Sequence, residues 1–153
     1  MSLIESKLKE MGLELPGLTP IRRIEPVKQL GNMLFVCGHG PERDGVPVIL
    51  GKVGAEVTLD QAYEAARLCA LNCLALVRRK IGDLDRVDEF IKVLGFVNSA
   101  PDFHEQPKVM NGFTDLIVEL YGERGRHARS AIGTNNLPNN QPVEVEAIIT
   151  VKD

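Results

Sequence analysis

Cationic and titratable side chains gather in GRHARSAIG, residues 125–133, near the C-terminal end of the sequence. Arg126, His127 and Arg129 stand directly before an expected strand. An arginine guanidinium can hold a carboxylate through two parallel hydrogen bonds, whereas a lysine offers only a point charge. The stretch therefore indicates an anion-binding segment in which Arg129 contacts a carboxylate; ordinary solvated surface is the alternative.

Two carboxylates follow in PVEVEAIITV, residues 142–151, which is expected to form a strand. Glu144 and Glu146 share one face of that strand, because strand side chains repeat every two residues. A carboxylate whose pKa is raised toward neutrality can act as a general base on water. One of the two glutamates is therefore a candidate base near the anion; the alternative is an ordinary exposed carboxylate.

Two expected helices must position these residues. Thr58 and Gln61 form a capping box at the start of a long helix with one face of small residues, and Gly82 ends it. Asp102 and Glu105 form a second capping box, which predicts the start of another helix despite a proline in its first turns. An apolar stripe continues that second helix to about residue 120.

The remaining apolar runs predict strands. Residues 32–38 and 46–51 are expected to pair as a hairpin about the turn Asp44-Gly45, after a strand at 24–30. The GKVG that follows reads as a turn into the first long helix, and not as a phosphate-binding loop. Residues 86–100 are apolar on both faces, as a central strand requires.

Together these elements predict an α/β (α+β) fold, a mixed β-sheet with two helices packed on one face. The opposite face of the sheet would then carry apolar side chains without a helix to cover them. Such a face implies a partner, and self-association is the expectation. Residues 1–20 are expected to be a partly helical N-terminal extension, and residues 21–153 a single domain.

Composition narrows the function classes. The formal net charge is −3 over 153 residues, so no broad basic surface is available for nucleic acid. The sequence has no run long and apolar enough for a membrane span and no secretory signal pattern, which favours the cytoplasm. Cys37, Cys69 and Cys73 are an odd set without paired spacing, so reduced thiols and no metal site are expected.

The motifs ARSAIG, LP and VEVEAI, in this order and spacing, resemble the C-terminal signature of the RidA/YjgF family of reactive enamine/imine deaminases, once described as L-PSP endoribonucleases. GNMLFVCGHGP, QAYEAARLCALNCLALV and VMNGFTDLIVELYG resemble the hairpin and the two helices of that family. The combination of CGHGP, GKVG and GRHARSAIG is most similar to a divergent subgroup. The resemblance covers nearly the whole chain from about residue 24.

This resemblance implies a chorismate-mutase-like fold, a homotrimer and ligand clefts between subunits. Arg129 matches the arginine that binds the carboxylate of 2-aminoacrylate or a related imino acid, and Asn111 matches an asparagine of the second helix. Ala131 matches a residue that contributes main-chain contacts, and Ser130 beside it is a further substrate-binding candidate. Glu144 matches the glutamate that positions water. Hydrolysis would give a 2-keto acid and ammonia without a cofactor.

The sequence also departs from the family pattern. Active members carry a GPYSQ-like segment with a pocket tyrosine, where this chain has IEPVKQLGN, and CGH replaces SGQ in the hairpin. His39, His127 and Cys37 are candidates to refill that space. The alternative function is a non-catalytic trimer that binds small carboxylates. RNA binding or cleavage through Arg124, Arg126, His127 and Arg129 is the third reading, for which a net acidic chain with few aromatic residues offers little support.

Overall fold

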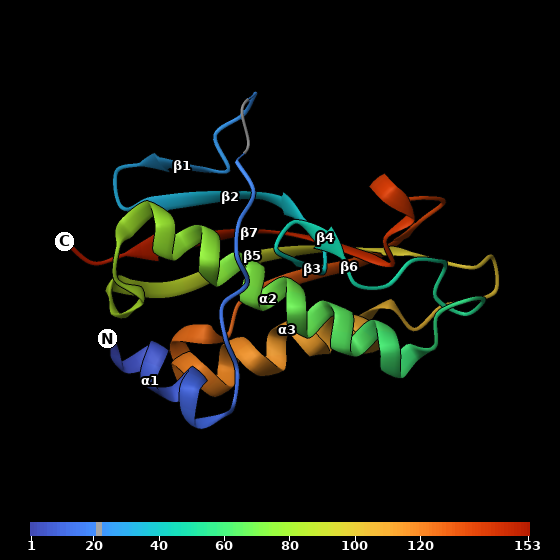
Figure 1. The fold of residues 1–153 in the computed structure, drawn as a ribbon, viewed down its shortest axis with the longest axis horizontal. Coiled ribbons are helices and arrows are strands. Elements are labelled where there is room, and N and C mark those ends of the chain that lie inside the picture. Colours follow the sequence, from blue (N-terminus) through green and yellow to red (C-terminus); the bar gives the residue numbers. More distant parts are fainter. Residues whose placement is uncertain (21–22) are drawn as a thin grey trace.

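A computed structural model describes residues 1–20 and 23–153 of the chain (Figure 1). Three short 3₁₀ turns, η1 (Leu84–Arg86), η2 (Gly122–Gly125) and η3 (Pro138–Asn140), interrupt the connections. The helices and strands follow in the order α1 (Leu3–Glu10), β1 (Val27–Leu30), β2 (Met33–His39), β3 (Glu42–Arg43), β4 (Val46–Pro47), α2 (Leu59–Ile81), β5 (Val87–Asn98), α3 (Gln106–Tyr121), β6 (Ala128–Thr134) and β7 (Val143–Val151).

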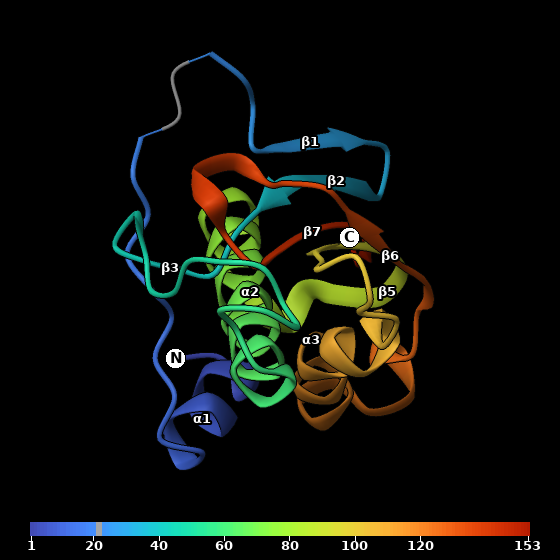
Figure 2. The ribbon, with the colours of Figure 1, turned by 90° about the vertical axis from the view of Figure 1, so that its right-hand side faces the viewer.

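The main sheet has the strand order β1-β2-β7-β5-β6, in which β5 and β6 are parallel and the other neighbours are antiparallel. Helices α2 and α3 lie side by side on one face of this sheet (Figure 2). The unit β5-α3-β6 supplies the parallel crossover. The predicted α+β class, with a mixed sheet and two helices on one face, is confirmed.

Helix α2 begins and ends where the sequence predicts. The Thr58 side chain accepts from the Gln61 amide while the Gln61 side chain accepts from the Thr58 amide, and Gly82 caps the C-terminus at φ 82°. Small buried residues on α2 let α3 approach closely. A β-carbon at Gly112 would lie 2.0 Å from the carbonyl oxygen of Tyr63, so only glycine fits at that contact.

Two sequence predictions are wrong in detail. The Asp44-Gly45 turn exists, with both residues at positive φ, but it joins two-residue strands in a separate small sheet. Strand β2 pairs with β1 and β7 instead of with residues 46–51, because Pro47 has no amide hydrogen to continue a ladder. The second capping box is also absent. Helix α3 starts at Gln106 after Glu105, which makes no side-chain cap, and its proline falls in the tolerated first turn.

The N-terminal segment forms a short helix and an extended strap. The carboxylate of Asp85 accepts hydrogen bonds from the amides of Leu3 and Ile4, which satisfies open donors at the start of α1. Ile4 and Leu8 are buried against the end of the helical layer. Residues 13–20 then cross α2 toward the β3–β4 turn, where the Gly17 amide donates to Asp44 (Figure 1). The division at residue 20 stays a prediction, since residues 21 and 22 lie outside the described residues.

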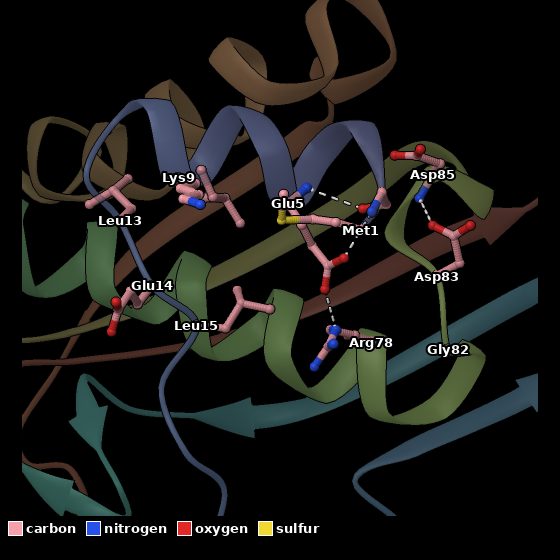
Figure 3. Close-up of a pocket in the computed structure, with 12 residues that line it drawn as sticks. Met1, Glu5, Lys9, Leu13, Glu14, Leu15, Arg78, Gly82, Asp83 and Asp85 are labelled. Carbon is pink, nitrogen blue, oxygen red and sulfur yellow. Dashed lines mark hydrogen bonds and ion pairs between the residues drawn. The ribbon is translucent and has the colours of Figure 1, made fainter.

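An open groove of about 890 Å³ lies between this segment and the C-terminal end of α2 (Figure 3). Its charges are mixed, and an ion pair between Arg78 and Glu5 spans it. None of the expected site residues lines this groove. Among the described residues, no helix combines the length and apolar character needed to cross a membrane.

No helix of the described residues covers the second face of the sheet (Figure 2). This face carries both apolar and charged side chains. Strand register identifies it, since side chains alternate with those buried under the helices. Phe35 and Ile132 are 39% and 47% exposed there. We call this the open face; its side chains include Lys28, Leu30, Met33, Phe35, Lys92, Leu94, Phe96, Ser130, Ile132, Glu144, Glu146, Ile148 and Thr150.

Candidate active site

Arg129 lies on β6, at the edge of the sheet, and turns toward helix α3. Its Nη1 donates to Asn111 Oδ1 and to Thr114 Oγ1, at 3.0 Å each. Its Nη2 donates to the main-chain carbonyl of Pro107 at 3.2 Å. The structure therefore brings together two of the expected site residues, Arg129 and Asn111, and fixes the plane of the guanidinium.

These three bonds leave part of the guanidinium available. A guanidinium carries five N–H donors, two on each Nη and one on Nε. The contacts to α3 use both on Nη1 and one on Nη2. Within the described residues, the Nε–H and the second Nη2–H have no acceptor, and no carboxylate lies at ion-pair distance. Two donors of one planar group match the two oxygens of a carboxylate.

Thr114 is a contact that the sequence reasoning missed. It lies one helical turn beyond Asn111, so both side chains reach the same face of α3. Its hydroxyl contacts Arg129 Nη1 on one side and His127 Nε2 on the other, the latter at 3.0 Å. The spacing Asn-x-x-Thr on a helix facing an arginine strand is the signal that could have identified it.

His127 lies behind Arg129 and is partly buried. Its Nδ1 contacts the carbonyl of Gly125 at 2.8 Å, and its ring packs against the rings of Phe113 and Phe90. Burial lowers the pKa of His127, and the nearby charge of Arg129 lowers it further. The neutral form is therefore favoured at pH 7, and the residue supports Arg129 from behind.

Glu144 occupies the open face of β7, beside Gly38 of β2. A β-carbon at Gly38 would lie 2.8 Å from Glu144 Oε2, so the glycine leaves room for the carboxylate. Burial raises the pKa of Glu144, and the like charge of Glu146 raises it further. Glu144 forms no ion pair within the described residues. Such a carboxylate has the electrostatic character of a general base.

Arg129 and Glu144 leave opposite faces of the sheet within one chain. Arg129 pairs in register with Val93, which is buried under the helices, whereas Glu144 pairs with Phe96 on the open face. A single chain therefore does not direct both side chains into one cleft. The two residues can act together only if a second copy supplies one of them.

The other candidate residues divide between these faces. Ser130 lies on the open face, where its hydroxyl accepts from Lys92 Nζ at 3.3 Å, and Ala131 packs toward the helical layer. Cys37 lies close to Glu144, and burial followed by that carboxylate raises the pKa of its thiol. The thiol form is thus favoured, which makes Cys37 a weak nucleophile.

His39 is turned away from both groups. Its ring nitrogens contact the main-chain carbonyls of Cys37 at 2.8 Å and Cys69 at 3.0 Å. A cavity of about 200 Å³ beside it lies under the N-terminal strap and against α2. Burial lowers the pKa of His39. This position gives His39 a place in the packing between strand and helix, apart from Glu144 on the open face.

The fold and these residues define a class of small α+β domain with an arginine at a sheet edge and a glutamate on the uncovered face. Residues 5–148 match the sequence model of the family described as "YjgF/chorismate mutase-like, putative endoribonuclease". The chain belongs to this YjgF/Rid family. The match covers both Arg129 and Glu144.

Three similar proteins support this membership. The Trypanosoma cruzi protein TCP17 is 38% identical over 98% of this chain and 95% of its own length. A crystal structure of a protein of unknown function from Agrobacterium tumefaciens is 42% identical, with a TM-score of 0.90 over 99% and 94% of the two chains. A crystal structure of a "putative endoribonuclease" from Shewanella oneidensis is 32% identical, with a TM-score of 0.91 over 97% and 99% of the two chains.

A more distant solved structure contains a ligand. E. coli TdcF, crystallised with bound serine, is 25% identical to this chain. Its TM-score is 0.57, over 90% of this chain and 93% of TdcF.

Proposed function

We propose that the protein hydrolyses small enamines or imines that carry a carboxylate, of the 2-aminoacrylate class. The products are the corresponding 2-keto acid and ammonia. In this proposal Arg129 holds the substrate carboxylate, Asn111 orients Arg129, and Glu144 positions the attacking water. Main-chain groups near Ala131 and Ser130 on β6 complete the carboxylate site.

One observation carries the proposal: the guanidinium of Arg129 is fixed by three hydrogen bonds yet keeps two donors without an acceptor in the described residues. An arginine held in this way binds a carboxylate with little further loss of side-chain freedom. Serine, bound in the TdcF structure, is also a small molecule with a carboxylate next to a nitrogen-bearing carbon. Membership of the same family supports a ligand of this class here.

The chemistry needs water and one proton carrier. The enamine first tautomerises to the imine, in which the carbon next to the carboxylate is electrophilic. Water adds to that carbon while Glu144 takes one of its protons and passes it to the imine nitrogen, which gives a carbinolamine. Glu144 then takes the hydroxyl proton and passes it to the same nitrogen as the carbon–nitrogen bond breaks, so that ammonia leaves and the keto group forms. The raised pKa of Glu144 suits both the uptake and the return of each proton. Holding the carboxylate beside the water makes the attack effectively intramolecular.

The proposed site is shared between two copies of the chain. Arg129 and Glu144 leave opposite faces of one sheet, so a cleft that contains both requires Arg129 of one copy beside the open face of another. The apolar side chains of the open face support such an interface, with Phe35 and Ile132 among its exposed members. A closed trimer, the assembly that the family resemblance implies, satisfies this arrangement.

The test measures release of ammonia and 2-keto acid from 2-aminoacrylate generated enzymatically in the assay. The intact protein is expected to accelerate release over the spontaneous rate, and Arg129→Ala is expected to abolish that acceleration. Arg126→Ala is the matched control, because Arg126 is exposed and its one ion pair within the described residues is with Glu123, at 3.4 Å. Equal rates for the intact protein and Arg129→Ala would refute the assignment of Arg129.

The alternative function is a carboxylate-binding protein without turnover. The absence of a tyrosine from IEPVKQLGN favours this alternative, because a hydroxyl donor is then missing from the expected cleft. Calorimetric binding of pyruvate or serine without any acceleration of 2-aminoacrylate hydrolysis would support it. Binding and acceleration together would support the deaminase.

A further inference from the structure

We propose that Thr114 and His127 act as positioning residues for Arg129, through a directional chain of hydrogen bonds behind the guanidinium. The chain runs from Arg129 Nη1 to Thr114 Oγ1 at 3.0 Å, from Thr114 to His127 Nε2 at 3.0 Å, and from His127 Nδ1 to the Gly125 carbonyl at 2.8 Å. It connects strand β6, helix α3 and the turn η2. The positioning of Arg129 does not depend on the proposed function. Its effect on ligand binding and turnover rests on that function.

The direction of each hydrogen bond follows from the chemistry of its ends. Arg129 can only donate, so Thr114 Oγ1 accepts there. The carbonyl of Gly125 can only accept, so His127 Nδ1 carries a hydrogen. The neutral ring then has a lone pair on Nε2, and the Thr114 hydroxyl donates to it. For a neutral ring, one arrangement of hydrogens satisfies all three contacts, and it is the Nδ1–H tautomer of His127.

The surroundings of His127 favour that neutral form. The rings of Phe113 from α3 and Phe90 from β5 lie 6.1 and 6.5 Å from its ring. Arg129, two residues further along the chain, presents a cation that disfavours a second positive charge. The other nearby cation, Arg124 of η2, is directed to the carbonyls of Val87 and Asp88 and stacks over Tyr121.

A protonated His127 would change this arrangement. Nε2 would then donate to the second lone pair of Thr114 Oγ1, and the Thr114 hydroxyl would have to turn its own hydrogen away from the ring. Two positive charges would face one oxygen, and their repulsion would weaken the hold of Thr114 on the guanidinium. Thr114 therefore links the protonation state of a partly buried histidine to the orientation of the carboxylate-binding group.

The experiment compares Thr114→Val, Thr114→Ser and the control Thr134→Val. Valine keeps the shape of threonine without its hydroxyl, and serine keeps the hydroxyl. Thr134 lies on the same strand as Arg129, with its hydroxyl donating to the Asn136 carbonyl away from the site.

The binding of pyruvate, the probe, is measured by titration calorimetry. Thr114→Val is expected to weaken pyruvate binding about tenfold, since a hydrogen bond to a charged group is lost. Thr114→Ser and Thr134→Val are expected to stay within about twofold of the intact protein.

Nuclear magnetic resonance supplies a readout that does not need a ligand. The ¹⁵N shifts of His127 are expected to show the Nδ1–H tautomer in the intact protein and in Thr114→Ser, and a tautomer mixture in Thr114→Val. The two Nη nitrogens of Arg129 are expected to resonate separately in the intact protein and to average in Thr114→Val. An Nε2–H tautomer, or unchanged Arg129 resonances in Thr114→Val, would overturn the inference. If pyruvate fails to bind the intact protein, the binding assignment fails and these resonances alone decide the inference.

Discussion

The two faces of the sheet carry the two halves of the candidate site, and they are built differently. On the helix-covered face, Arg129 is held by three hydrogen bonds to α3 and supported from behind by Thr114 and His127. On the open face, Glu144 forms no ion pair within the described residues, and burial and Glu146 raise its pKa. The anion-binding half is organised within one chain, while the carboxylate half is left without a counter-charge.

This difference shows what a second copy would contribute. A half-buried carboxylate without a partner costs stability, because its ionised form is desolvated and gains no compensating bond. An interface that brings a substrate, a water and the edge of another β6 strand to Glu144 would supply those partners. The open face would thus gain its polar contacts from the same event that buries Phe35 and Ile132.

The largest expected effect on turnover comes from replacing Glu144. Glu144→Gln keeps the shape of the side chain but cannot take a proton, so 2-aminoacrylate hydrolysis should fall about 10²- to 10⁴-fold. Pyruvate affinity should change little, because Arg129 is untouched.

Glu146→Gln is the matched control two residues along the same face. It should retain turnover and move the acid limb of the pH profile to lower pH, because loss of its charge lowers the pKa of Glu144. Full turnover by Glu144→Gln would remove Glu144 from the mechanism.

Mixing two inactive variants tests whether the halves come from different chains. Arg129→Ala and Glu144→Gln chains should each be inactive alone. Unfolded together and refolded, randomly assembled oligomers should regain about a quarter of the intact activity, since a quarter of the interfaces receive both functional residues. Assay of the mixture against each separate refolded variant provides the measurement. A mixture that stays inactive while it co-assembles would place both residues in one chain's site.

A third prediction concerns the open face itself. Ile132→Glu places a charge at a 47% exposed apolar side chain of that face and should convert the assembly to monomers, with loss of turnover. Light scattering coupled to size-exclusion chromatography measures the mass. Val46→Glu is the control, because Val46 is 64% exposed on the small β3–β4 hairpin away from the open face. An unchanged mass for Ile132→Glu would exclude this face as the interface.

The elements of the fold were more predictable than the geometry of the site. Helix α2 follows from the Thr58–Gln61 capping box and the stop at Gly82, which are local signals. The prediction that residues 46–51 pair with residues 32–38 was wrong. The turn signal at Asp44-Gly45 does not show how far the strand pairing continues past Pro47. Strand alternation correctly placed Glu144 and Glu146 on one face.

The sequence could not give the relation between Arg129 and Glu144. That relation depends on the register of β5 with both β6 and β7, which long-range pairing decides. Thr114 was missed for a related reason. A helix pattern shows that Thr114 and Asn111 share a face, but not that the edge strand brings an arginine and a histidine to that face.

The smallest expected effect contrasts two partly buried histidines, His39 and His127. His127 has one acceptor and one hydroxyl beside its ring, which suit the neutral form, whereas His39 faces two carbonyls with a single hydrogen to donate. Burial nevertheless lowers the pKa of His39. A lowered pKa in the folded state means that the unfolded chain binds more protons as the pH falls below the ordinary value near 6.5. The stabilising contribution is therefore present above that value and is lost at lower pH.

His39→Asn should remove this dependence and keep one amide donor near the Cys37 carbonyl. Urea unfolding at several pH values between 7.5 and 5 should show that the intact protein loses stability relative to the variant by at most about 1.4 kcal/mol per pH unit. Comparing the two proteins at each pH cancels the opposite contribution of Glu144, whose raised pKa favours the folded state at lower pH. His104→Asn, at an exposed position, is the control and should follow the intact protein. A gain in relative stability on acidification would show that the two carbonyls outweigh burial and hold His39 as a cation.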